Sequence, residues 1–124
     1  MRKLFLIPLT LVLASCYQQE RQCQNFKTGT FVFETEIDGV KKTSRFVRTD
    51  SIEIETFEGQ IDTSSVRWIN DCEYVLQKMN PKNRAEQKAV SMKILTTDGN
   101  TYTFEYGLVG DAKKQRGTIE KVSE

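Results

Sequence analysis

The chain contains no histidine, the side chain that most often acts as a general base, a metal ligand or the activator of a nucleophile. It also lacks a G-x-S-x-G motif, a glycine-rich phosphate loop and a long predicted helix to present one. These absences favour a protein that is not an enzyme, and we expect neither a metal nor a cofactor. Paired carboxylates leave catalysis as the less favoured alternative.

Long hydrophobic runs are scarce, and the clearest one lies at the N-terminus. Residues 4–13 are apolar apart from two positions and follow the basic pair Arg2 and Lys3. A basic start, a short apolar run and small residues are typical of a secretory signal peptide, and the run is too short to span a bilayer. Pro8 in mid-segment disfavours a buried helix. We expect residues 1–15 to be a signal peptide.

The junction after this segment resembles the bacterial lipobox, in Leu13-Ala14-Ser15-Cys16. The resemblance implies that Cys16 carries a diacylglycerol and an acylated amine, which together anchor a protein firmly. Tyr17 stands where an aspartate would favour the inner membrane, so the outer membrane is expected. Glu20 is the one acid close behind the cysteine, which favours the periplasmic face. Residues 16–25 then form a lipidated polar tether.

Charge of either sign is not in excess. Without Arg2 and Lys3, the 18 basic residues fall to 16 against 17 acidic residues, and the net charge goes from +1 to −1. Such balance argues against nucleic acid as a partner. The expected partners are the membrane, through the lipid on Cys16, and another envelope protein or a small apolar ligand.

Cysteine is also sparse, since the chain has three. If Cys16 is acylated, Cys23 and Cys72 are the two thiols left in an oxidising compartment, and we predict that they form a disulfide. The 49-residue separation would stabilise the fold by ~4 kcal/mol in the chain-entropy model. Two buried free cysteines are the alternative. A structural zinc site would need more ligands.

The remaining sequence reads as β-strands with period-two alternation. Asp38-Gly39 lies between two extended runs and predicts a two-residue hairpin loop. That register places Phe31 opposite Phe46 on one face and Glu36 opposite Lys41 on the other. One residue of slip would lose both pairs.

The next runs continue the alternation. In 52–57 we predict that Ile52 and Ile54 face inward and that Glu53 and Glu55 face outward. Residues 64–79 predict one longer strand whose core-facing side carries a shared set of residues: Val66, Trp68, Asn70, Cys72, Tyr74 and Leu76. Asn70 is the polar member of that face and needs a partner there, or a ligand to orient.

A second hairpin is predicted around "TTDGNT". A three-residue loop at 97–99 keeps the apolar residues on one face and pairs Ile94 with Tyr102 and Met92 with Phe104. A two-residue loop at Asp98-Gly99 would place a lysine on that face, so we prefer the longer loop.

These elements predict an all-β domain over residues 26–124, with about seven to eight antiparallel strands. Consecutive hairpins favour a small up-and-down barrel, and a sandwich is the alternative. We expect a barrel of this size to be filled by its aromatic side chains, although a cavity for an apolar ligand is a second option.

The strand pattern is similar to lipocalin-like (calycin) barrels, a resemblance that implies a ligand-binding interior. Trp68 lies outside the first strand, and Phe31 stands two residues after Gly29 where that family has its tryptophan. The block "SVRWINDCEYVLQKMNPKNRAE" resembles an uncharacterised family of small Gram-negative envelope lipoproteins. Some members carry the name DNA topoisomerase IV, which we do not transfer, because the 109 residues after residue 15 cannot hold that enzyme's modules.

Two binding functions follow. In the first, an outer-membrane lipoprotein contacts another envelope component through polar residues that flank the most aromatic strand: Arg67, Asp71, Glu73, Lys82 and Arg84. In the second, the barrel carries a small apolar ligand that Asn70 orients. We expect a filled interior for the first function and a cavity of a few hundred Å³ for the second.

Overall fold

The structure is a computed structural model that describes residues 20–124. The predicted signal peptide (1–15) and the predicted lipid attachment site, Cys16, lie outside the described residues.

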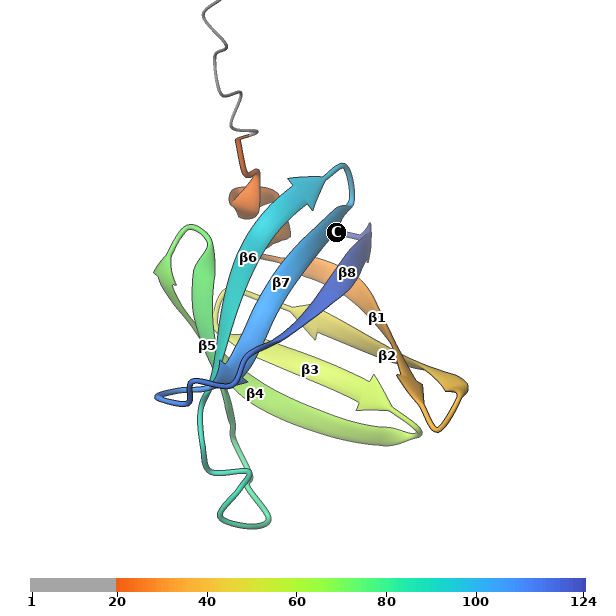
Figure 1. Cartoon of the computed structure of the whole chain (residues 1–124), viewed down its shortest axis with the longest axis vertical. Helices are drawn as coiled ribbons and strands as arrows, with labels where there is room; N and C mark the ends of the chain where they lie inside the picture. Colours follow the sequence, from red (N-terminus) through yellow and green to blue (C-terminus); the bar gives the residue numbers. More distant parts are fainter. Residues whose placement is uncertain (1–19) are drawn as a thin grey trace, which may run out of the picture.

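The domain is a closed antiparallel up-and-down barrel in which each strand pairs with the next and β8 pairs with β1 (Figure 1). A short 3-10 helix, η1 (Cys23–Phe26), precedes the barrel. The strands are β1 (Gly29–Ile37), β2 (Val40–Arg48), β3 (Ile52–Phe57), β4 (Gln60–Asn70), β5 (Glu73–Lys78), β6 (Val90–Asp98), β7 (Thr101–Leu108) and β8 (Gln115–Ser123). The predicted fold class is confirmed.

The first hairpin has the predicted register. Phe31 lies opposite Phe46 in the strand register, and Glu36 lies opposite Lys41. Asp38 and Gly39 both have positive φ, at 53° and 76°, as a type I′ turn requires. Turn chemistry and the apolar pattern therefore agree on this pairing.

The predicted orientation of β3 is wrong. Phe46 on β2 faces the core and pairs with Glu55, and the inward Arg48 pairs with Glu53. Directly paired residues share a face of the sheet, so the acidic residues of β3 face inward. Glu53 is 9% exposed, whereas Ile54 is 37% exposed on the outer surface.

The predicted long strand at 64–79 is a hairpin, β4 and β5, that turns at Asp71 and Cys72. Trp68 pairs with Tyr74, so the even-numbered residues face inward on both strands. Asn70, however, lies exposed beside the turn. Its predicted place on the buried face is wrong, because the strand ends there.

The predicted register of the second hairpin is also wrong. Asp98 lies opposite Thr101 across a Gly99-Asn100 turn. A bulge between Ile94 and Thr96 shifts the register, so that Ile94 and Met92 still face the core. Ile94 consequently pairs with Phe104. The inward face is as expected, but the pairs along it are not.

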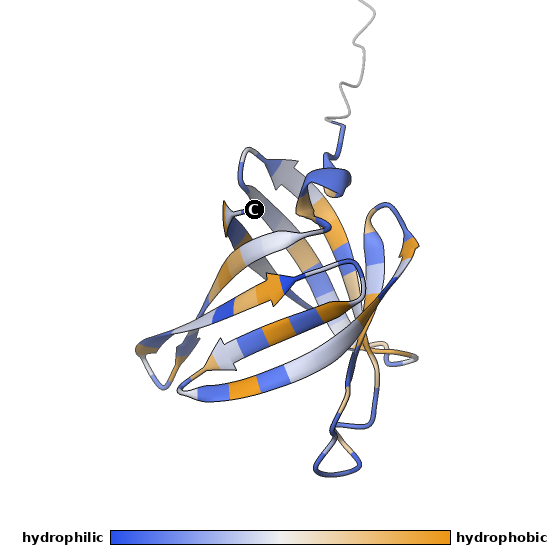
Figure 2. Cartoon of the chain, turned by 180° about the vertical axis from the view of Figure 1, so that it is seen from behind, coloured by the Kyte–Doolittle hydropathy of each residue, from blue (hydrophilic) through white to orange (hydrophobic). Residues whose placement is uncertain are grey.

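The strands position two unlike ends of the barrel. Hydrophobic and hydrophilic residues alternate along the strands that face the viewer in Figure 2. The buried core lies toward the end that carries η1, which we call the sealed end. The opposite end, where the loop at residues 79–89 lies (Figure 1), is called the open end.

Candidate functional site

The sealed end is covered by η1, which a disulfide joins to the β4–β5 turn. Cys23 and Cys72 are bonded, with their Cα atoms 5.2 Å apart, so the predicted pairing is confirmed. Cys23 and Phe26 are both almost fully buried. The residue before η1 is also attached, because the Gln22 backbone N–H donates to Thr97 Oγ1 (2.8 Å). Residues 22–25 of the predicted tether therefore belong to the barrel end.

A buried arginine lies beneath η1. Arg48, 1% exposed, donates through Nη1 to the carbonyl oxygen of Phe26 (2.6 Å). Its Nε and Nη2 both donate to Glu53 Oε1, at 3.2 and 2.9 Å. Nη2 also lies within hydrogen-bonding distance of the hydroxyls of Tyr74 (2.7 Å) and Tyr102 (3.1 Å). One side chain thus ties η1 to four strands.

Aromatic rings enclose the same guanidinium. Its Cζ lies 4.6 Å from the ring centroids of both Phe31 and Tyr74. Phe46 and Trp68 lie farther out, at 5.3 and 6.0 Å. Cation–π attraction of this kind is stronger at desolvated sites. The Arg48 guanidinium is therefore enclosed by packed side chains.

The ionisation of this cluster suits a structural role. Burial alone would lower the pKa of Arg48. Tyr74, Tyr102 and Glu53 together raise it by more than burial lowers it, so the pKa lies above its usual value. Burial raises the pKa of Glu53, and Arg48 offsets only part of that rise. Burial also raises the pKa of both tyrosines, so neither hydroxyl is a base at neutral pH.

The open end holds a pocket of about 410 Å³ inside the barrel mouth. Its strand residues lie on the same face as the core residues, by the pairing of Glu53 with Ser64, Ser64 with Lys78, and Leu76 with Val90. Residues of the 79–89 loop complete the wall. The lining combines apolar and charged side chains: Glu53, Glu55, Asp62, Ser64, Leu76, Lys78, Asn83, Ala85, Glu86, Lys88, Val90 and Leu108.

Ion pairs hold the loop against the pocket. Lys78 Nζ lies 2.9 Å from Glu86 Oε1 and 3.9 Å from Asp62 Oδ2. The Asn83 side chain caps the turn, because it accepts from the Glu86 backbone N–H (2.9 Å). Hydrogen bonding between Lys78 and Glu86 raises the pKa of the lysine and lowers that of the carboxyl. Glu55 has no ion-pair partner among residues 20–124.

Three of the predicted contact residues lie at the sealed end, beside the disulfide. Asn70, Asp71 and Glu73 line a polar cleft of about 680 Å³ between the β4–β5 turn and η1. The Asn70 amide donates to Glu73 Oε2 (3.0 Å), and Asp71 pairs with Lys27 (3.4 Å). The Asn70 bond links the two sides of the turn, and the Asp71 pair joins the turn to the residue after η1, while their role as contacts stays a prediction.

The other predicted contact residues lie elsewhere. Arg67 is exposed on the outer face of β4, and Lys82 and Arg84 are exposed in the loop at the open end. The structure therefore divides the predicted contact set among the two ends and the outer face of β4. Sequence reasoning missed Arg48 and the acidic lining of the pocket, although Arg48 shares the alternation of Phe46.

No protein family, no curated protein and no solved structure matches this chain. Within residues 20–124, no three histidine, cysteine or acidic side chains gather as a metal site requires. The same part of the chain has no helix that is long and apolar enough to cross a membrane. The geometry defines a small β-barrel with one sealed end and one open end.

Proposed function

We propose that the protein is a lipid-anchored binding protein of the cell envelope, held at the periplasmic face of the outer membrane by Cys16 and acting without catalysis. One observation carries this proposal: η1 joins the barrel at the sealed end (Figure 1), whereas the pocket is lined by residues of the opposite, open end. An anchor just before residue 20 would keep the sealed end near the membrane. The open end would then face away and meet a partner.

The chemistry of the open end supports binding. The loop carries exposed basic residues, Lys82, Arg84 and Lys88, around a pocket with an acidic interior. Charges of opposite sign on a rim and in a pocket give orientation and specificity to a partner. Of the predicted contact residues, Lys82 and Arg84 are therefore the ones that we assign to a partner.

The anchor is tested by the intact mass of protein extracted from membranes. We expect loss of residues 1–15, added acyl mass on Cys16 and a mass two hydrogens lower than that of the reduced form. The Cys16→Ser variant should leave the outer-membrane fraction. Cytosolic protein without lipid would contradict the proposal.

The binding end is tested by photo-crosslinking in intact cells. A crosslinking residue at Arg84 should capture a partner, and the same residue at Asp71 should capture none. Both positions are exposed, so the pair is a matched control. Capture from Asp71 alone would show that the sealed end is the binding end.

A second candidate function is the carriage of a small amphiphile. The pocket places Leu76, Val90 and Leu108 beside Glu55, whose carboxylate has no ion-pair partner among the described residues. This lining suits an apolar body with a cationic group. A fluorescent cationic amphiphile should bind with one-to-one, saturable stoichiometry. Leu76→Trp, which fills the pocket, should abolish uptake, whereas Ile61→Trp on the exposed surface should leave it intact.

A further inference from the structure

The barrel is joined along only part of the seam between β1 and β8. These strands pair from Thr30 and Ser123 as far as Phe33 and Ile119. Both strands then continue, but residues 34–37 pair only with β2 and residues 115–118 pair only with β7 within the described chain. Figure 1 shows the two strands diverging toward the open end.

The diverging edges form the walls of a cleft of about 650 Å³. Its lining comes from both strands and includes Glu34, Thr35 and Glu36 from β1, and Arg116, Gly117 and Thr118 from β8. Two unpaired strand edges present free backbone N–H and C=O groups. Such edges are templates for an added strand, unless proline, a bulge or charged side chains, lysine above all, protect them.

These segments lack proline, lysine and a bulge, and the protection that they carry is limited to the charged side chains of Glu34, Glu36 and Arg116. Neither 34–37 nor 115–118 contains a proline or a lysine. The bulge on the β1–β8 seam lies at Thr30 and Phe31, away from the cleft. At the start of the cleft, the Phe33 ring packs against Gly117, where an added Cβ would come within 2.9 Å of it. The floor is therefore a tightly packed aromatic ring, which leaves the edges above it open.

We propose that this cleft binds an extended segment of another protein as an added β-strand, with basic side chains at alternate positions. Because β1 and β8 are antiparallel, the added strand would run antiparallel to one wall and parallel to the other. Four residues on each wall would accommodate a partner stretch of about 13 Å. Backbone hydrogen bonds would supply affinity, and alternate side chains would supply specificity.

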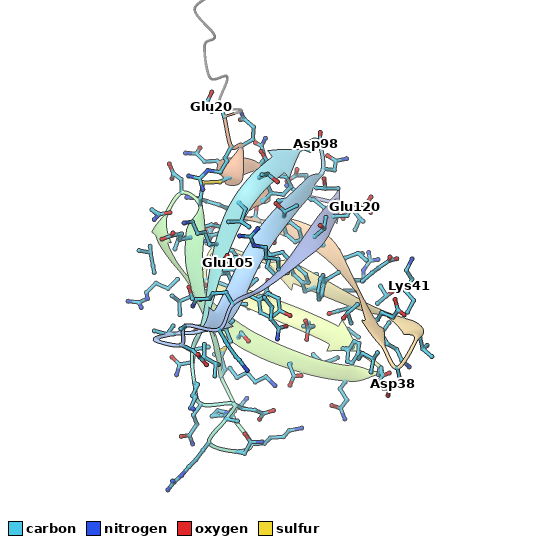
Figure 3. All side chains as sticks on the ribbon, in the orientation of Figure 1. Glu20, Asp38, Lys41, Asp98, Glu105 and Glu120 are labelled. Atoms are coloured by element: carbon cyan, nitrogen blue, oxygen red, sulfur yellow. A yellow bond between two sulfur atoms is a disulfide. The ribbon has the colours of Figure 1, made fainter. Side chains whose placement is uncertain are left out.

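The charge of the cleft selects the partner. Glu34, Glu36 and Glu120 lie exposed along its outer rim, against one cation, Arg116. Glu34 already pairs with Lys41 (3.1 Å) and Arg116 with Glu105 (3.4 Å), while Glu36 and Glu120 have no ion-pair partner in residues 20–124. Glu120 belongs to β8 and Glu105 to the adjacent β7, and both are labelled in Figure 3. Lysine or arginine on the added strand would neutralise Glu36 and Glu120.

The same charges disfavour a second copy of this chain as the occupant. Antiparallel pairing of two β1 edges would bring Glu34 and Glu36 of one copy beside those of the other, and like charges across strands are destabilising. The proposal rests on the binding role proposed above, but it requires neither the lipid nor the pocket.

The test uses hydrogen exchange of the purified full chain with the peptide acetyl-KVKVKVK-amide. We expect saturable binding that slows exchange at 34–37 and 115–118 by at least about tenfold. An acidic peptide, EVEVEVE, and a KVKVKVK peptide with N-methylated alternate amides should not bind. Glu36→Lys should weaken the basic peptide about three- to fivefold. Asp50→Lys, an equal charge change in the exposed β2–β3 turn, should have no effect.

Absence of protection, or protection confined to other strands, would overturn the proposal. A dimer whose edges are already protected without peptide would overturn it in favour of a second copy. If the peptide fails while the lipid mass and the Arg84 crosslink are found, the strand-addition proposal alone is wrong. If the peptide binds while those two tests fail, the proposed envelope function is wrong.

Discussion

The two ends of the barrel use the same kind of ion pair with different consequences. At the sealed end, the Arg48 and Glu53 side chains are 0% and 11% exposed. At the open end, those of Lys78 and Glu86 are 36% and 25% exposed at the same separation of 2.9 Å. Breaking a buried pair leaves an uncompensated charge, whereas water replaces a partner at an exposed one. Exposure, and not distance, therefore decides what each pair contributes.

This difference predicts where the molecule is able to change shape. The sealed end combines a disulfide, a buried cluster and the aromatic core. The open end has a loop held by exposed ion pairs and a seam that is only partly paired. Regions with few buried contacts open locally, at lower free energy than the whole fold. A binding site at the open end can thus adjust without unfolding the barrel.

The largest effect is expected from Arg48→Met. This variant leaves Glu53 buried without its cation and should lower the free energy of unfolding by about 3–5 kcal/mol, measured by urea denaturation of the full chain. Arg48→Met/Glu53→Gln should recover at least about 1 kcal/mol, because both charges are then gone. Additive losses would show that the two charges are not coupled.

Removal of the disulfide should have the next largest effect. The Cys23→Ser/Cys72→Ser variant is expected to lose about 2–4 kcal/mol of stability, because the unfolded chain regains its freedom. Reduction of the wild-type protein should give the same loss. A denaturation midpoint that neither change moves would exclude a stabilising role for the bond.

A pH-dependent effect is expected from Glu53. Burial raises its pKa in the folded state, so the folded chain holds this proton more tightly than the unfolded chain. The protonated Glu53 therefore makes its whole contribution to the free energy of unfolding when the pH is below the pKa of this group in the unfolded chain. The contribution falls as the pH rises through its pKa in the folded chain, by at most about 1.4 kcal/mol per pH unit. Urea denaturation at several pH values should show that the free energy of unfolding of the wild type falls relative to that of Glu53→Gln as the pH rises. A rise of the wild-type value relative to the variant would contradict the raised pKa.

The smallest effect is expected at the open end. Lys78→Met removes a partly exposed ion pair and should change stability by less than about 1 kcal/mol. The same urea denaturation compares it directly with Arg48→Met. Equal losses of stability in Lys78→Met and Arg48→Met would contradict the claim that the buried ion pair contributes more than the exposed one.

Local chemistry made much of the fold predictable. The Asp38-Gly39 turn set the first hairpin, because both residues tolerate positive φ. The Cys23–Cys72 bond followed from the cysteine count and the expected compartment. In each case one strong local preference agrees with the tertiary structure.

The errors occur where tertiary structure overrides hydropathy. The alternation of apolar and polar residues predicted that Ile54 faces inward. In the structure Glu53 lies opposite the buried Arg48, so Glu53 faces inward and Ile54 faces outward. A buried ion pair has no hydropathy signature. The β4–β5 turn was hidden because Trp68 and Tyr74 keep the same facing whether the strand turns or continues.

The bulge beside Ile94 changes the strand register of the second hairpin, and the residues of its turn do not indicate that a bulge is present. The candidate site was less predictable still, because its parts come from strands far apart in the chain. Lys82 and Arg84 were predicted as contacts, but the pocket beside them depends on the inward acids of β3. The predicted barrel implies that the first and last strands pair, but the sequence does not show how far the pairing of β1 with β8 extends, because it leaves no local signal.

Hydrogen exchange of the unliganded full chain tests the contrast between the two ends most directly. We predict that core amides at the sealed end, such as those of Tyr74 and Tyr102, exchange only through global unfolding, at the free energy found by urea denaturation. Amides in 34–37, 79–89 and 115–118 should exchange at least about a hundredfold faster. Uniform protection across both ends would contradict the account.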